Sequence, residues 1–280
     1  MRFVLARSVR PAWMVAPVAV VALCAAGCGG HGALDRSEGA SPPARLGSLG
    51  PHREPVASRP KPVLCHAATT TLGSADLAYA AVVRRRAIVR TAPSSRSSVV
   101  ARLGRVDENG FDEVLGVIGS RSAGSCAPGW YRVQLSVLPN ETQGWVRAWA
   151  VRVYRVQTRI VVDLAQRRLR LYRAGKLVLQ TRVAVGSPAT PTPTGRFFVD
   201  ERWTLSNASG PFGPAALGIS AHSVALQNVW VEHGPIGIHG TDEPWSIGEA
   251  ASNGCIRLPN GEMQALFPLV AAGTPVVVQA

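Results

Sequence analysis

This 280-residue sequence is short of charge, aromatic rings and sulfur. Charged residues make up 17% of it and aromatic residues 6%, and it holds 3 Met and 5 Cys. A composition with 28 Gly and 21 Pro, but without a repeating unit, excludes a coiled coil and a collagen and favours turn-rich β structure. A single long uncharged stretch lies at the N-terminus, which excludes a membrane protein with several spans.

Acidic residues are scarce as well. There are 17 Asp and Glu against 30 Lys and Arg, so the formal charge is +13. A basic protein suits anionic partners such as wall polymers or lipid headgroups. The sequence has no motif that combines aromatic and basic residues in the manner of RNA-binding proteins, so no nucleic-acid partner is expected.

The N-terminus has the layout of a secretory signal. Arg2, Arg7 and Arg10 precede an uncharged run that ends in small residues before Cys28. The end of this run, Ala-Ala-Gly-Cys, resembles the lipobox of bacterial lipoproteins, which implies cleavage after residue 27 and lipidation of Cys28. An ordinary cleaved signal and an uncleaved anchor are the alternatives. All three predict an exported protein at the outer face of the cytoplasmic membrane or in the cell wall.

Residues 28–64 predict a disordered tether. The segment is rich in Gly, Pro, Ser and Ala and has no apolar periodicity, so it cannot bury enough surface to become ordered. Two cysteines flank the following region, Cys65 and Cys126, and in an exported protein we expect them to form a disulfide. The alternative is that both are free and buried. Cys255 is then the odd cysteine and a candidate reactive thiol.

Residues 65–155 predict a small β-barrel. Short apolar runs at 87–90, 99–103, 114–118, 129–134 and 144–147 are separated by Gly, Ser, Asn and Pro. The series VRTAPS, VVARL, GWYRVQL and GWVRAW resembles the bacterial SH3-like domain, which often accompanies cell-wall enzymes. Whether this domain binds a ligand or acts as a spacer stays open.

Residues 156–280 predict a second, mainly β domain with one or two short helices. Runs at 159–164, 168–172, 176–179 and 274–278 have the pattern of strands, and Leu169 and Leu171 should share one face. Asn260 is expected to cap a short helix that ends near Phe267.

Cys255 is the candidate nucleophile. His239 lies 16 residues upstream, close enough for a loop to return and place its imidazole beside the sulfur. Ser252, Asn253 and Gly254 are small or polar, so their backbone N–H groups can approach a substrate carbonyl and stabilise an oxyanion. No second ligand-spaced Cys or His surrounds Cys255, so neither a metal nor a cofactor is expected.

The segment IHGTDEPWSIGEAASNGCIRL resembles the signature of the YkuD-type L,D-transpeptidase catalytic domain, and the flanking TPTPTGRF and AAGTPVVV agree with it. The family has a mainly β, sandwich-like fold and remodels peptidoglycan. The resemblance implies that Cys255 forms a thioester with a stem peptide and that His239 is the base, oriented by the carbonyl of Gly240. It also implies substrate contacts by Thr241 and by Arg257.

The resemblance further implies that the enzyme joins a donor tetrapeptide to the side-chain amine of an acceptor stem, giving a 3→3 cross-link. Hydrolysis of the same thioester, as in an L,D-carboxypeptidase, is the alternative reaction. A non-catalytic wall-binding lipoprotein is the alternative of a different class. A sortase and an NlpC-type peptidase fit the order and spacing of His239, Cys255 and Arg257 less well. The protein is expected to be a monomer, held at the membrane through Cys28.

Overall fold

The computed structural model describes residues 66–122, 124, 126–226 and 234–280. The predicted signal, Cys28 and the tether lie outside these residues. Within them strands predominate and one α-helix is present, α1 (Asn260–Leu266), which confirms the prediction of a mainly β protein. No described helix has the length and apolar character needed to cross a membrane.

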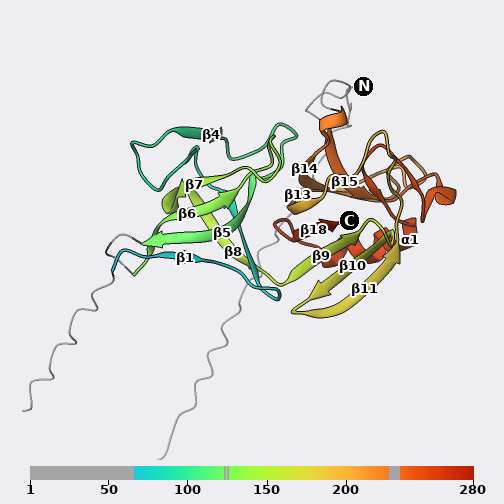
Figure 1. The fold of residues 1–280 in the computed structure, drawn as a ribbon, viewed down its shortest axis with the longest axis horizontal. Coiled ribbons are helices and arrows are strands. Elements are labelled where there is room, and N and C mark those ends of the chain that lie inside the picture. The colour runs from blue at the N-terminus through green and yellow to red at the C-terminus, as the bar shows by residue number, and fades with distance from the viewer. Residues whose placement is uncertain (1–65, 123, 125, 227–233) are drawn as a thin grey trace, which may run out of the picture. The chain divides into compact units, whose positions relative to one another are not determined.

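The first sheet contains the five strands expected between residues 87 and 147 and three more. They are β1 (Thr69–Thr71), β2 (Ala78–Val83), β3 (Ala87–Arg90), β4 (Val99–Leu103), β5 (Val114–Ser122), β6 (Pro128–Gln134), β7 (Gln143–Arg147) and β8 (Val151–Val156). Their order is β4-β3-β7-β6-β5-β2-β8, with β1 paired to β5, and they run from blue to green in Figure 1. A small core of alternating side chains, with Leu115 and Val133 fully buried, supports this sheet.

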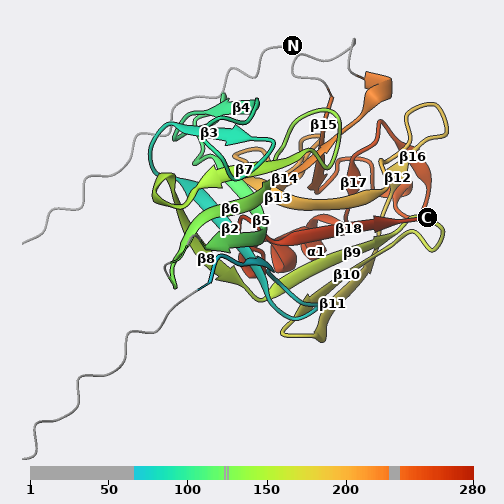
Figure 2. The same cartoon turned by 60° about the vertical axis from the view of Figure 1, so that its left-hand side comes forward.

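The second sheet carries the candidate site. Its strands are β9 (Thr158–Asp163), β10 (Arg168–Arg173), β11 (Lys176–Arg182), β13 (Gly195–Thr204), β14 (Ala215–His222), β15 (Pro235–His239), β17 (Ile256–Arg257) and β18 (Pro275–Gln279). Their order is β11-β10-β9-β18-β13-β14-β15-β17, and Figure 2 shows β18 between β13 and β9. A separate two-stranded sheet pairs β12 (Val185–Gly186) with β16 (Ala250–Ser252).

Short 3-10 helices complete the described elements: η1 (Ala148–Ala150), η2 (Val224–Leu226), η3 (Pro244–Ser246) and η4 (Phe267–Leu269).

Alternation of side chains explains the second sheet. In β10, Leu169 and Leu171 are fully buried while Arg168 and Arg170 are not, as predicted from their spacing. The C-terminal strand β18 pairs in parallel with β9 and antiparallel with β13, so it lies inside the sheet and contributes Val276 to the core. This position makes the end of the chain part of the framework under the site.

Hydrogen bonds also join the two sheets, and the described residues from His66 to Ala280 belong to one compact unit. Ser136 Oγ donates to Asp200 Oδ2 at 2.6 Å, and Asn109 Nδ2 donates to Glu201 Oε1 at 2.9 Å. β8 ends at Val156 and β9 begins at Thr158. The domain boundary predicted at 155/156 stays a prediction.

Acidic side chains are half-buried at this junction. Burial raises the pKa of Asp200 to about 6, against the hydrogen bond from Ser136. Burial also raises the pKa of Glu113 to about 7, and the nearby carboxylates of Asp107 and Asp200 add to the rise. The junction therefore favours the protonated form of these acids.

Candidate active site

Two adjacent parallel strands bring His239 and Cys255 together. β15 ends at His239, and β17 begins directly after Cys255. Ile238 pairs with Ile256 in this ladder, and both side chains are fully buried. Because side chains alternate along a strand, His239 and Cys255 lie on the sheet face opposite these isoleucines.

Gly237 separates the thiol from the imidazole. Its N–H donates to Cys255 Sγ at 3.5 Å. A Cβ on Gly237 would lie 3.8 Å from His239 Cδ2, so a side chain at residue 237 would contact the imidazole ring. Because residue 237 is glycine, no side chain from this position lies between Cys255 and His239.

The turn before Cys255 depends on Gly254. This residue has φ +106°, which side chains rarely adopt, and a Cβ there would lie 2.8 Å from Ile236 Cδ1. Thr192 Oγ1 donates to the Gly254 carbonyl at 2.8 Å, and Ser252 Oγ donates to the Cys255 carbonyl at 2.6 Å. Side-chain hydrogen bonds from both ends therefore fix the backbone that carries the thiol.

His239 is held as a neutral base. Its Nδ1 lies 2.5 Å from the Gly240 carbonyl oxygen, which can only accept, so Nδ1 carries the hydrogen and Nε2 keeps its lone pair. Burial lowers the pKa of His239 to about 4; the Arg257 charge acts in the same direction and the Gly240 bond opposes it. The Phe212 ring packs edge-on at 4.9 Å between centroids and adds to this burial.

Cys255 is held as a neutral thiol. Burial raises its pKa, against the smaller effects of the Gly237 N–H and the Arg257 charge. Within the residues the structure describes, no hydrogen bond joins Sγ to the His239 ring. The thiol and the imidazole are thus both uncharged in this state, and proton transfer between them must accompany attack on a substrate.

Arg257 is already paired. Its Nη1 forms an ion pair with Glu243 Oε2, while its buried Nε has no hydrogen-bond partner. Thr241 Oγ1 accepts from the Glu243 N–H at 2.9 Å, which fixes the loop that carries the carboxylate. A substrate carboxylate that binds Arg257 therefore meets a competing carboxylate.

The structure gathers the other predicted residues around this pair. Thr241 and Ser252 are buried, and Asn253 is exposed at the turn. The Gly254 N–H donates to Ser252 Oγ at 3.2 Å. The oxyanion role predicted for that N–H requires this bond to be exchanged for one to the substrate.

Asn260 does not cap α1, contrary to the sequence-based expectation. The cap position falls on Pro259, and no side chain caps the helix. Asn260 instead accepts a hydrogen bond from the Thr241 N–H at 2.7 Å through its Oδ1. The spacing before the helix suggested a cap, but a partner 19 residues away is set by the tertiary fold.

Three further site residues were missed from the sequence: Phe212, Glu243 and Thr192. Each reaches the site from a loop, and none has a local pattern that distinguishes it from an ordinary packing or surface residue. Of the remaining cysteines, Cys126 is disulfide-bonded. Cys65 lies outside the described residues, so their pairing stays a prediction, as does the lipidation of Cys28.

A neutral imidazole and a thiol on neighbouring strands define a Cys–His site of the kind found in cysteine-nucleophile enzymes. The model of the YkuD family, the L,D-transpeptidase catalytic domain, matches residues 157–278. The chain belongs to this family.

The chain is similar in sequence to curated relatives and to solved structures. The chain is 40% identical to a Bacillus licheniformis protein named L,D-transpeptidase YkuD, over 43% of this chain and 64% of the relative. The Bacillus subtilis protein of the same name is 34% identical over 45% of this chain and 68% of the relative. The catalytic domain from the E. faecium L,D-transpeptidase, solved by NMR, is 30% identical with a TM-score of 0.33, over 44% of this chain and 96% of that chain. The chain thus spans just under two thirds of the Bacillus licheniformis relative.

Proposed function

We propose that this protein is a peptidoglycan L,D-transpeptidase that forms 3→3 cross-links. One observation carries the proposal: the β15–β17 pairing places Cys255 beside a His239 whose Nδ1 is bonded to the Gly240 carbonyl. That bond leaves Nε2 as the proton acceptor. The family of the catalytic domain supports stem peptides as the substrate class.

The first half-reaction forms the acyl-enzyme. Cys255 Sγ attacks the carbonyl carbon of the third residue of a donor tetrapeptide while His239 Nε2 takes the thiol proton. Backbone N–H groups of the 253–255 turn stabilise the oxyanion. The carbon–nitrogen bond then breaks, and D-Ala leaves with the proton from His239. The product is a thioester on Cys255.

The second half-reaction transfers the acyl group. The side-chain amine of the third residue of another stem attacks the thioester carbonyl and gives a proton to His239. The carbon–sulfur bond breaks, and the sulfur recovers the proton as a neutral thiol. Water in place of the amine gives the tripeptide of an L,D-carboxypeptidase, so access of the acceptor decides between the two products.

The low pKa of His239 leaves the imidazole neutral, although it also makes Nε2 a weaker base than a free imidazole. At pH 7 the imidazole is neutral and can accept the thiol proton, although burial keeps the thiol itself from ionising. Arg257 would bind a carboxylate of the stem after exchange of Glu243. A charge at this position orients the donor carbonyl against Sγ, and it lowers the pKa of the thiol by less than burial raises it.

The setting of the enzyme is part of the same proposal. The basic head and small residues before Cys28 support export and a lipid anchor. The polar, proline-rich 28–64 segment supports a tether that lets the catalytic domain reach the wall. The short strands and Gly-Trp pairs of residues 65–155 support an SH3-like domain, and a monomer is sufficient because His239 and Cys255 lie on one chain.

Mass spectrometry of products tests the reaction. The purified protein is incubated with disaccharide-tetrapeptide, alongside Cys255→Ala. A dimer that has lost one D-Ala, absent with the variant, supports transpeptidation. Tripeptide without dimer would move the assignment to carboxypeptidase. Products from Cys255→Ala equal to those of the wild type would reject Cys255 as the nucleophile.

A further inference from the structure

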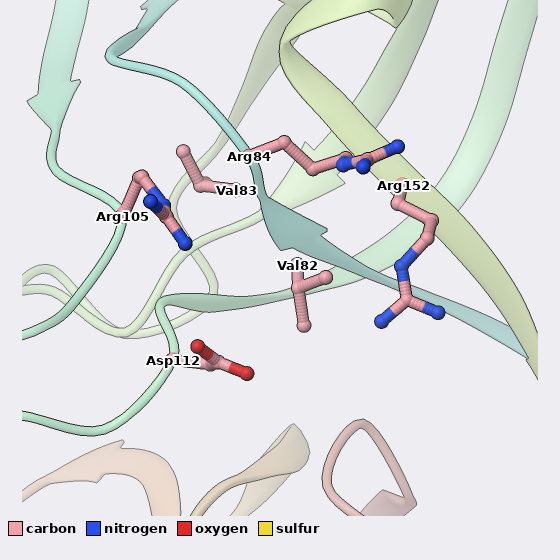
Figure 3. Close-up of a pocket in the computed structure, with 6 residues that line it drawn as sticks. All are labelled: Val82, Val83, Arg84, Arg105, Asp112 and Arg152. Carbon is pink, nitrogen blue, oxygen red and sulfur yellow. The ribbon is translucent and has the colours of Figure 1, made fainter.

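Three arginines line a pocket on the first sheet, away from the candidate active site. Arg84, Arg105 and Arg152 surround a hollow of about 500 Å³ together with Asp112 and two valines. Figure 3 shows Arg84 and Arg152 on one side of the pocket and Arg105 with Asp112 on the other. The pocket is therefore strongly basic.

Backbone pairing fixes where two of these arginines attach to the sheet, while the side chains of all three are exposed. Arg152 on β8 pairs with Val82 on β2 across an antiparallel ladder. Arg84 follows the end of β2, and its N–H donates to the Ala150 carbonyl at 2.9 Å. The two guanidinium groups therefore come from neighbouring strands of one rigid sheet.

The third arginine is attached to the same frame from another segment. The Glu113 N–H donates to the Arg105 carbonyl at 3.0 Å, and the Val83 N–H donates to the Glu113 carbonyl at 3.0 Å. The backbone of Arg105 is thus joined to β2 through Glu113, which bonds to both segments. Three chain segments converge on this hollow because backbone hydrogen bonds join them.

None of these guanidinium groups has an ion-pair or hydrogen-bond partner in the described part of the chain. Three arginines and one aspartate give the pocket a formal charge of +2. Like charges that share a hollow repel one another unless a counter-ion lies between them. Guanidinium groups bind phosphate oxygens through paired N–H donors, so phosphate is a suitable counter-ion.

We propose that this pocket binds an anion with phosphate groups and at least two negative charges. The phosphate belongs either to a soluble molecule or to a lipid headgroup, and the arginines recognise the same chemistry in both. The site is separate from the Cys255 chemistry and does not depend on it.

Binding measurements with matched variants test the site. Arg84→Gln/Arg152→Gln removes two guanidinium groups from the pocket. Arg96→Gln/Arg102→Gln removes two exposed ones elsewhere, in the β3–β4 turn and on β4, with the same change in charge. Calorimetry with inorganic pyrophosphate, with unchanged near-UV circular dichroism as the folding check, should show an affinity at least about tenfold lower in the pocket variant. The control variant should stay within about twofold.

Flotation with vesicles distinguishes the sources of phosphate. Phosphatidylcholine vesicles give the baseline of any lipid anchor, and cardiolipin, whose headgroup carries two phosphates, is then added to them. An increment that the pocket variant loses assigns a lipid headgroup; pyrophosphate binding without that increment assigns a soluble phosphate. Equal losses in both variants, or no binding of either probe by the wild type, would overturn the proposal. If the double variant does not fold, Arg105→Gln takes its place.

A second inference concerns Asn260 and rests on the proposed function. Its Oδ1 accepts from the Thr241 N–H at 2.7 Å, and its Nδ2 donates to the Ala208 carbonyl at 3.2 Å. A Cβ on either Gly213 or Gly240 would overlap Asn260 Oδ1, so the amide is packed against both backbones. This amide therefore fixes the peptide unit whose carbonyl orients His239.

We infer that Asn260 is a positioning residue that acts through Gly240. Loss of the amide frees the Gly240 carbonyl, and the imidazole then loses the bond that fixes its tautomer. The expected result for Asn260→Ala is a kcat about tenfold lower with little change in KM, because the substrate contacts remain. Glu262→Ala, on the same helix, is the control.

Asn260→Asp serves as the conservative variant, since it keeps an acceptor for the Thr241 N–H. It should recover most of the lost kcat, whereas a purely structural role would lower Tm and kcat together in both variants. An active wild type with an unaffected Asn260→Ala would overturn the inference alone. An inactive wild type would instead reject the proposed function.

Discussion

The two sheets of this protein use their polar residues in opposite ways. Around the second sheet the polar groups of the site are enclosed: His239 is 4% exposed and rests on a core that contains Ile238 and Ile256. The first sheet has a smaller core and carries its arginines at the surface. Burial shifts the pKa of a group and fixes the orientation of its side chain. Exposed charges act at longer range and tolerate movement of the side chain.

This difference explains why one region shows a specific signature and the other does not. The HGT and SNGC segments need particular residues, because small changes in a packed loop displace the reacting atoms. Exposed arginines can occupy several positions on a sheet and still attract an anion. Substitutions around the buried site should therefore have larger effects than substitutions in the first sheet.

The largest effect is expected from His239→Gln. Glutamine can still bond to the Gly240 carbonyl but cannot accept the thiol proton, so kcat should fall by about 10²- to 10⁴-fold. Steady-state release of D-Ala measures it, and Arg96→Gln in the β3–β4 turn is the control. A fall of less than about threefold would show that the proton leaves Cys255 by another route.

Gly254→Ala comes next. The residue has φ +106°, and the new Cβ would meet Ile236, so the turn that carries Cys255 must shift. We expect kcat to fall by about 10- to 100-fold. Gly261→Ala is the matched control, since nothing lies within 4 Å of a Cβ there. Equal kcat values for the two variants would contradict the role of this turn.

Glu243→Gln tests the pairing of Arg257. Removal of the competing carboxylate should lower KM for a stem with a free carboxylate by about threefold and leave a carboxamide stem unchanged. The comparison of KM for the two substrates measures it. A higher KM for the carboxylate stem would mean that Glu243 holds Arg257 in its binding position.

The smallest effect is expected at the junction of the two sheets, on stability. The pKa of Glu113 rises from 4.5 to about 7 on folding, so its stabilising contribution is complete below pH 4.5 and is lost as the pH rises through 7. Glu113→Gln should therefore raise Tm by about 2–6 °C at pH 8 and change it little at pH 4. Thermal melts at both pH values measure this.

Glu262→Gln is the control for the junction, since it removes an acid from α1 instead. An equal rise in both variants would assign the effect to overall charge. The His239 pKa works in the opposite direction: it falls from 6.5 to about 4 on folding, so its contribution to stability is lost as the pH drops from 6.5 towards 4. Melts of His239→Gln between those pH values separate the two effects.

The sequence by itself determined the class of fold and predicted the candidate reacting pair, Cys255 and His239. Alternation placed Leu169 and Leu171 inside, and the β9, β10 and β18 segments were recognisable because their patterns are local. The small residues before Cys255 and the His-Gly-Thr motif that begins at His239 were likewise readable, since chemistry restricts which residues can stand there. Most of the later strands, β13 to β17, had no clear local pattern.

Only the tertiary structure decided how these residues meet. The parallel β15–β17 pairing, the pairing of Arg257 with Glu243 and the bond from Thr241 to Asn260 all join residues distant in sequence. The burial that keeps both His239 and Cys255 neutral likewise arises from packing by the whole domain. Local pattern limits the choice of residues, but long-range packing sets their partners and their pKa values.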